Sequence, residues 1–167
     1  CADVSFQQAK FKEIATFRGK TGDSNFFNEA NFESVLLPRL NILQFVDVDC
    51  SRTRFLGADV ILMNFDGVQW CPVSKTRCGI YDELLQKRNK EFFSITDVEQ
   101  LYRSLKQNYE GRRDLARAGD FHIGEKEMRL KNPRTPPSLR ALLWLSKTFS
   151  GYGESYLRPF FWFVGLL

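Results

Sequence analysis

The chain contains a single histidine, and the residues around it could in principle bind a metal ion. His122 and Glu125 have the H-x-x-E spacing that places an imidazole and a carboxylate on one face of a helix, and Glu127 adds a second carboxylate. A di-iron bundle needs such a pair from each of two helices together with further carboxylates. One histidine cannot supply that set, so we expect a packed His122 and an i,i+4 ion pair between Glu125 and Arg129 on a solvated face. The sequence predicts no metal ion and no cofactor.

Cysteine chemistry is a second possibility. The four cysteines are Cys1, Cys50, Cys71 and Cys78, and none has C-x-x-C spacing. Cys71 and Cys78 could pair or bind a metal ion, but no second pair of ligands lies near them in the sequence. Reduced structural thiols are therefore the favoured interpretation. Because the sequence also lacks a Ser-His-Asp set, a Cys-His pair with an orienting group and a glycine-rich phosphate loop, we do not expect an enzyme.

Bulky residues recur at every fifth position in the first seventy residues. A helix repeats about every 3.6 residues and a strand about every two, so neither explains this spacing. The run is uninterrupted from Phe45 to Trp70, and it continues upstream if one extra residue is allowed between Phe11 and Phe17 and a longer slip at residues 37–40. We expect these positions to form the core of a repeat fold. They are Phe6, Phe11, Phe17, Phe27, Phe32, Leu37, Phe45, Cys50, Phe55, Val60, Phe65 and Trp70.

Two of the units read Ala30-Asn31-Phe32 and Ala58-Asp59-Val60. The segment resembles the pentapeptide-repeat family, whose unit is a small residue, Asp or Asn, Leu or Phe, and two variable residues. This resemblance implies a mainly β fold, a right-handed quadrilateral β-helix (pentapeptide-repeat solenoid), over residues 1–72. An empty slot at Gly22 and apolar residues at outward positions such as Leu56 depart from the family pattern.

The five-residue period then stops, and a connector over residues 73–94 leads to helical sequence. Thr96 and Glu99 form a T-x-x-E capping box at the start of the first helix. We expect residues 95–131 to form an α-helical hairpin that caps or flanks the repeats. Residues 102–131 also resemble the helical segment that follows the repeats in many membrane-associated bacterial pentapeptide-repeat proteins.

The C-terminal sequence indicates contact with a membrane. Residues 138–149 form an amphipathic helix that suits a membrane interface, with a buried helix of a soluble domain as the alternative. Residues 156–167 are rich in aromatic and aliphatic side chains and carry a single charge. A spanning helix needs about 20 residues, so we expect the start of a truncated transmembrane segment, with a core strand or helix as the alternative. Because the chain begins at Cys1 without an initiator Met, we expect it to be a fragment.

Charge is distributed unevenly along the chain. Residues 1–70 hold seven Lys or Arg against nine Asp or Glu, whereas residues 71–167 hold seventeen against eleven. Positive charge beside a first span stays on the cytoplasmic side, and basic side chains favour anionic lipid. We therefore expect a membrane-associated protein with its repeat region on the cytoplasmic side. The membrane-proximal basic residues are Lys126, Arg129, Lys131, Arg134, Arg140, Lys147 and Arg158.

These patterns predict a non-enzymatic, membrane-tethered scaffold or protein-interaction module, with an unidentified protein partner and with membrane lipid at its C-terminal end. The cytoplasmic regulatory domain of an ion channel is the alternative, because some relatives of this arrangement carry a pore segment downstream. A DNA mimic that binds gyrase is less favoured, since such proteins are strongly acidic. Lys and Arg are interleaved with Asp and Glu over residues 95–131, so we expect no direct binding to nucleic acid.

Overall fold

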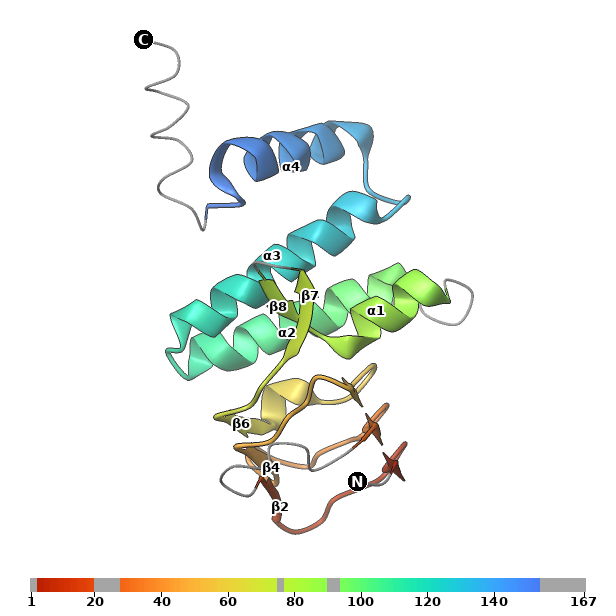
Figure 1. Ribbon diagram of the computed structural model, residues 1–167, viewed down its shortest axis with the longest axis vertical. Coiled ribbons are helices and arrows are strands. Elements are labelled where there is room, and N and C mark those ends of the chain that lie inside the picture. Colours follow the sequence, from red (N-terminus) through yellow and green to blue (C-terminus); the bar gives the residue numbers. More distant parts are fainter. Residues whose placement is uncertain (1–2, 20–27, 75–76, 90–93, 154–167) are drawn as a thin grey trace.

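The computed structural model describes residues 3–19, 28–74, 77–89 and 94–153. The strands are β1 (Val4–Ser5), β2 (Ala15–Arg18), β3 (Ala30–Asn31), β4 (Leu43–Val46), β5 (Thr53–Arg54), β6 (Asn64–Asp66), β7 (Cys71–Ser74) and β8 (Arg77–Gly79). A 3₁₀ turn, η1 (Val60–Leu62), precedes β6. The helices are α1 (Tyr81–Arg88), α2 (Ile95–Gly111), α3 (Leu115–Lys131) and α4 (Pro137–Ser150). Figure 1 shows the early strands at one end of the molecule, α1 to α3 across the middle, and α4 beyond α3.

The first six strands pair in parallel, in the orders β1-β3-β5 and β2-β4-β6. In the second sheet the register places Phe17 opposite Phe45, and Phe45 opposite Phe65. The rings of both pairs are stacked with centroids 5.4 Å apart. The chain thus returns to the same place in successive layers, and it brings one aromatic ring above another each time.

A second column of rings runs beside the first. Phe6 stacks on Phe32 at 4.9 Å, and Phe32 stacks on Phe55 at 5.8 Å. Rings of the two columns meet edge to face, as between Phe32 and Phe45 at 5.1 Å. Edge-to-face and offset-stacked pairs each add about 0.5 to 1.5 kcal/mol beyond the burial of their apolar area. These columns form the core of the strand region.

The predicted fold class is wrong. Within the described ranges, α-helices hold more residues than strands, so the fold is mixed α/β rather than mainly β. The strands form two separate three-stranded parallel sheets and one antiparallel pair, β7-β8, and they do not join into a closed or solenoid sheet. Each strand of the two parallel sheets is only two to four residues long, and the two sheets are not hydrogen-bonded into one. The prediction of a quadrilateral β-helix therefore fails.

The predicted membrane-spanning helix is not found in the part of the chain that the structure describes. None of the helices within the described residues is both long enough and apolar enough to cross a bilayer. The predicted start of such a segment, residues 156–167, lies outside the described residues, as do Phe27 and Arg158.

The helices differ in two respects from the sequence-based expectation. The first is the helix start, where the predicted capping box of Thr96 and Glu99 is wrong. Helix α2 begins at Ile95, and its cap is Ser94, whose hydroxyl accepts a hydrogen bond from the Thr96 N–H at 3.2 Å. The second is the segment predicted as a connector, residues 73–94, which contains the end of β7 and all of β8 and α1. Helices α2 and α3 pack closely against each other, and a Cβ added at Gly124 would overlap the ring of Tyr102. Gly124 thus permits the close approach of the two helices.

Candidate functional site

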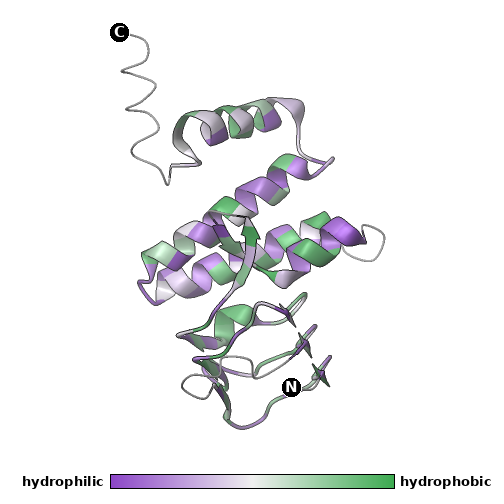
Figure 2. Cartoon of the chain, viewed as in Figure 1, coloured by the Kyte–Doolittle hydropathy of each residue, from purple (hydrophilic) through white to green (hydrophobic). Residues whose placement is uncertain are grey.

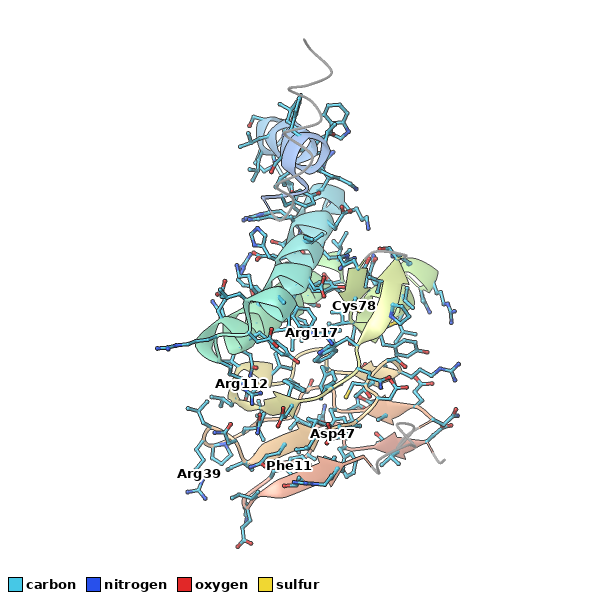
Figure 3. All side chains as sticks on the ribbon, turned by 60° about the vertical axis from the view of Figure 1, so that its left-hand side comes forward. Phe11, Arg39, Asp47, Cys78, Arg112 and Arg117 are labelled. Atoms are coloured by element: carbon cyan, nitrogen blue, oxygen red, sulfur yellow. The ribbon has the colours of Figure 1, made fainter. Side chains whose placement is uncertain are left out.

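The residues predicted to form the repeat core lie inside the strand region. Phe6, Phe11 and Phe17, in the first layer, are only partly buried. Figure 3 shows Phe11 in the strands far from the helices. Burial is therefore nearly complete beside the helices and lower at the opposite end of the strand region. The buried members of the set are Phe32, Leu37, Phe45, Cys50, Phe55, Val60, Phe65 and Trp70.

Helix α2 and its C-cap residue, Arg112, supply polar side chains that bond to the backbone of the last strand layer. The buried side-chain amide of Asn108 donates to three carbonyl oxygens, at 2.9, 3.1 and 2.8 Å, those of Val60, Ile61 and Met63. Arg112 donates to the carbonyl oxygen of Phe65 at 2.6 Å, and Figure 3 shows it where the helices meet the strands. Backbone oxygens that turn toward the helices therefore have side-chain donors, as buried carbonyl groups require. Neither Asn108 nor Arg112 was predicted from the sequence as a functional or structural residue.

Aromatic side chains complete this junction between helices and strands. The indole N–H of Trp70 donates to the Tyr109 hydroxyl at 2.9 Å, and the ring of Phe121 from α3 lies edge to face with Trp70 at 5.2 Å. Burial raises the pKa of Tyr109 to about 12, although the hydrogen bond from Trp70 opposes the rise. Tyr109 is thus a neutral structural side chain, and the aromatic core continues from the strands into the α2–α3 pair.

Helix α1 places a buried carboxyl group at the edge of β5. The Asp82 carboxyl accepts a hydrogen bond from the backbone N–H of Phe55 at 3.1 Å. It therefore bonds to the edge of the sheet where a further strand would pair. Burial raises the pKa of Asp82 to about 7, although hydrogen bonds from backbone N–H groups, that of Phe55 foremost, oppose the rise.

The neighbouring residue, Glu83, is the centre of a buried charged network. Its carboxylate lies 2.7 Å from the Arg77 guanidinium and 2.8 Å from the Lys87 ammonium, and it accepts a hydrogen bond from the Tyr102 hydroxyl. Burial alone would raise the pKa of Glu83, but the Arg77 charge and these hydrogen bonds lower it below its usual range. Burial raises the pKa of Tyr102. The network joins β8, α1 and α2, and its groups are directed at one another.

The predicted interaction of Glu125 with Arg129 is wrong. Glu125 is 3% exposed and pairs across the helix interface with Arg103 at 3.0 Å and Lys106 at 3.1 Å. Arg129 lies instead 3.6 Å from Glu99. Although burial raises the pKa of Glu125, the hydrogen bonds from Arg103 and Lys106 more than offset this and lower it. Packing between α2 and α3 thus decides the ion pairs, rather than spacing along α3.

His122 and the cysteines are the other candidates for chemistry. His122 is partly buried on α3, and within residues 3–19, 28–74, 77–89 and 94–153 no group of three His, Cys, Asp or Glu side chains could hold a metal ion. The three described cysteines are free thiols. Burial raises the pKa of Cys50 to about 12, with an opposing hydrogen bond from Thr53. Cys78 on β8 lies opposite Pro72, while Cys71 lies opposite Gly79.

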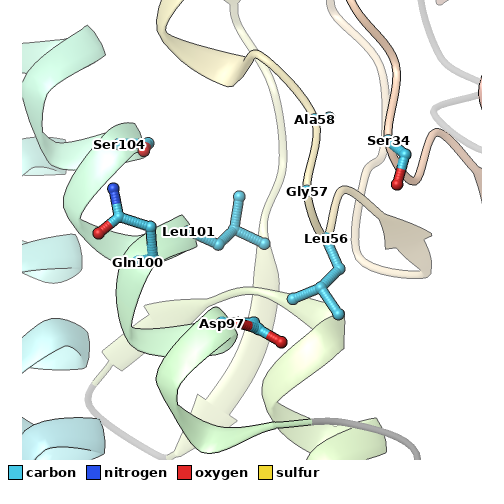
Figure 4. A pocket seen from close by; sticks show the side chains of 8 residues that line it. All are labelled: Ser34, Leu56, Gly57, Ala58, Asp97, Gln100, Leu101 and Ser104. Carbon is cyan, nitrogen blue, oxygen red and sulfur yellow. The ribbon is translucent and has the colours of Figure 1, made fainter.

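An open groove of about 380 Å³ separates α2 from a turn of the strand region (Figure 4). Leu56 and Ser34 line it on one side, and Asp97, Gln100 and Ser104 line it on the other. Asp97 is the single ionisable side chain among the lining residues. The groove can therefore accept a small polar or cationic group, but its lining lacks a nucleophile paired with a base.

Helix α4 presents the most exposed apolar surface of any described helix. One face packs toward α3 through Leu143, which is 7% exposed. On the outward face, Leu142, Trp144, Leu145 and Phe149 are 61%, 58%, 44% and 45% exposed. Figure 2 shows hydrophobic residues along α4 although it lies at the edge of the molecule. This α4 outward face is the candidate functional site.

Four of the predicted membrane-proximal basic residues are bonded within the chain. Lys147 lies 2.7 Å from Glu127, and Arg140 donates to the carbonyl oxygen of Asn132 at 3.1 Å. Arg129 pairs with Glu99, and Lys131 lies 3.8 Å from Glu83 and 4.0 Å from Glu127. The structure therefore directs these side chains toward acidic groups and carbonyl oxygens of the body. Lys126 is partly buried on α3, and Arg134 is exposed between α3 and α4.

Comparison of the chain with protein-family models, with curated proteins and with solved structures gave no match, so the resemblance to the pentapeptide-repeat family stays a prediction.

Proposed function

We propose that the chain is a non-enzymatic interaction module that rests on a membrane surface through α4 and offers its strand and helix body to a protein partner. The α4 outward face carries this proposal, because it exposes four large apolar side chains on a helix that is already fixed to the body by its other face. A contiguous exposed apolar patch of this kind marks an interaction site.

A lipid surface fits this face in three ways. Helix α4 contains no acidic residue, so nothing on it repels a phosphate-bearing headgroup. Trp144 has an apolar ring with a polar N–H, the combination that is enriched at membrane interfaces. Further along the sequence, the residues from Pro159 to Leu167 carry no charged side chain. Each half-exposed Leu, Phe or Trp side chain contributes on the order of 1 kcal/mol when it leaves water, so the four on this face supply enough for reversible docking.

The body is suited to a scaffold rather than to catalysis. Its buried ionisable and amide groups are used to join elements: Glu83 binds Arg77, Glu125 binds Arg103, and Asn108 binds carbonyl oxygens. Groups held in this way stiffen the structure and leave little for a substrate. A stiff body with its two aromatic columns would hold a protein partner at a fixed distance from the membrane. The cytoplasmic side remains the sequence-based prediction for its location.

Vesicle flotation of the full chain tests the proposal. Vesicles of phosphatidylcholine with about one quarter phosphatidylserine should carry the wild-type chain to the top of a density gradient. The double variant Leu142→Gln/Leu145→Gln should bind at least about tenfold more weakly, because two leucines no longer enter the interface. Leu115→Gln is the matched control, since Leu115 is 72% exposed on α3, away from the α4 outward face.

Two results would refute the proposal. A wild-type chain that stays at the bottom of the gradient would mean that the α4 outward face is not a lipid site. A double variant that floats as well as wild type would place the contact elsewhere. Circular dichroism of each variant shows that a lost interaction is not lost folding, because these side chains are exposed and should not affect the core.

A further inference from the structure

The two charged side chains of α4 are both engaged within the chain. The Arg140 guanidinium donates to the carbonyl oxygen of Asn132 at 3.1 Å, with those of Pro133 and Thr135 at 3.5 Å. The Lys147 ammonium lies 2.7 Å from the Glu127 carboxylate. Both cations are therefore compensated by the body, and a lipid phosphate would have to compete with these internal partners.

The arc of α4 that faces solvent carries no charge. At about 100° per residue, Trp144, Ala141, Leu145, Phe149 and Leu142 follow one another around the helix without an intervening Lys, Arg, Asp or Glu. Thr148 lies within this arc, and its hydroxyl donates to the carbonyl oxygen of Trp144 at 2.9 Å. Its polar hydrogen is thus satisfied inside the helix, which lowers the cost of placing this face against acyl chains.

We infer that α4 enters the membrane interface by apolar insertion and takes neutral lipid without needing an anionic surface. This inference rests on the proposed function and names the lipid class that the same face takes. Binding that depends on buried apolar area responds to headgroup packing and weakly to salt, whereas attraction of exposed cations to anionic headgroups is screened within about 10 Å at ordinary ionic strength. Because Arg140 and Lys147 are bonded within the chain, binding should depend on buried apolar area rather than on attraction of cations to the headgroups.

The two modes of binding differ greatly in the preference for anionic over neutral vesicles that they predict, which makes the inference testable. Each Lys or Arg that reaches an anionic surface favours binding by roughly fivefold. The six described residues of the membrane-proximal basic set, all but Arg158, would together give a preference on the order of ten-thousandfold. Four of these six are bonded within the chain and Lys126 is partly buried on α3, which leaves Arg134 exposed. We therefore expect less than about a tenfold preference for anionic over neutral vesicles. Raising salt from about 50 mM to about 500 mM should change binding by less than about threefold.

The experiment measures partition coefficients of the full chain on pure phosphatidylcholine vesicles and on vesicles with about one quarter phosphatidylserine, each at low and high salt. A Glu127→Gln variant tests the cause. Glu127 holds Lys147 in the body, so its neutralisation should raise the preference for anionic vesicles by roughly fivefold and make it salt-sensitive. Glu110→Gln is the matched control, because Glu110 is exposed at the end of α2.

Each outcome of these measurements supports or overturns the inference. Binding to both vesicle types with a preference below about tenfold, together with a gain of charge selectivity in the Glu127→Gln variant alone, supports the inference. A larger preference for anionic vesicles, or a Glu127→Gln variant that behaves as wild type, overturns it while the proposed membrane contact stands. Binding to neither vesicle type overturns both, and floating of the Leu142→Gln/Leu145→Gln variant as well as wild type assigns the contact to another part of the chain.

Discussion

Asn108 joins the helices to the strands through one side-chain amide, and its substitution tests how the two parts of the fold are held together. The amide nitrogen donates to the carbonyl oxygens of Val60, Ile61 and Met63, all within 3.1 Å, and the side chain is 6% exposed. Two substitutions separate the contributions of shape and hydrogen bonding. Asn108→Ala removes the whole group, and Asn108→Asp keeps its shape while replacing the donor by an acceptor.

The magnitudes follow from the bonding pattern. A buried hydrogen bond contributes about 1 kcal/mol net, and a buried acceptor left without a donor costs about 1 to 3 kcal/mol. The carbonyl oxygen of Val60 keeps one partner, the N–H of Met63 at 3.2 Å, so not every loss is complete. Asn108→Ala should therefore lower the free energy of unfolding by roughly 2 to 4 kcal/mol. Asn108→Asp should cost more at neutral pH, because it faces a carboxylate toward three carbonyl oxygens without an added cation.

Urea unfolding, followed by tryptophan fluorescence and far-ultraviolet circular dichroism, measures both variants. Gln107→Ala is the control, since Gln107 is an exposed amide one position earlier on α2. The introduced carboxyl group of the Asn108→Asp variant should have a pKa raised by burial. Its destabilisation should therefore shrink as the pH falls below the carboxyl pKa of the folded state. An Asn108→Asp variant with the wild-type urea midpoint at neutral pH would refute the role assigned to the amide.

Two further predictions concern the core and its charged edge. Phe65→Ala removes a ring that stacks on Phe45 at 5.4 Å and on Tyr109 at 6.4 Å, so it should lower the free energy of unfolding by about 3 to 5 kcal/mol. Gln69→Ala, at an exposed position, should lower it by about 0.5 kcal/mol or less. Equal urea midpoints for the two variants would contradict the stacked ring columns. Burial raises the pKa of Asp82 from 3.8 to about 7, so its stabilising contribution is fully present below the unfolded-state pKa and is lost as pH rises from about 4 to about 7, by a few kcal/mol. Asp82→Asn should remove this decline, and parallel pH profiles of the two proteins would disprove the assignment.

The spacing of aromatic residues predicted which side chains would share a core, although it did not predict the fold class. Phe45, Phe55 and Phe65 are buried because successive layers return the chain to the same register. A spacing of five residues reports which positions point inward. It does not report how long each strand is, whether the sheets join, or how many residues of the chain become helix, and these decide the class.

Helix α1 was missed for a physical reason. Its buried residues are Asp82, Glu83 and Gln86, so its buried face does not show the apolar periodicity that marks a helix in a sequence. Their burial is offset by partners far away in the sequence: the Phe55 N–H for Asp82, and Arg77 and Lys87 for Glu83. The acidic pair Asp82-Glu83 at the start of α1 was the available signal, since acidic residues favour a helix N-terminus.

Long-range ion pairs could not be predicted from the sequence, yet they decide the proposed chemistry of the surface. Counting Lys and Arg near the C-terminal end predicts a basic patch that seeks anionic lipid. The fold instead directs Arg129 to Glu99 and Lys147 to Glu127. The same contacts therefore attach α3 and α4 to the body and compensate the positive charge beside the α4 outward face. What that face still offers is apolar area, and apolar area selects a surface by the packing of its headgroups rather than by their charge.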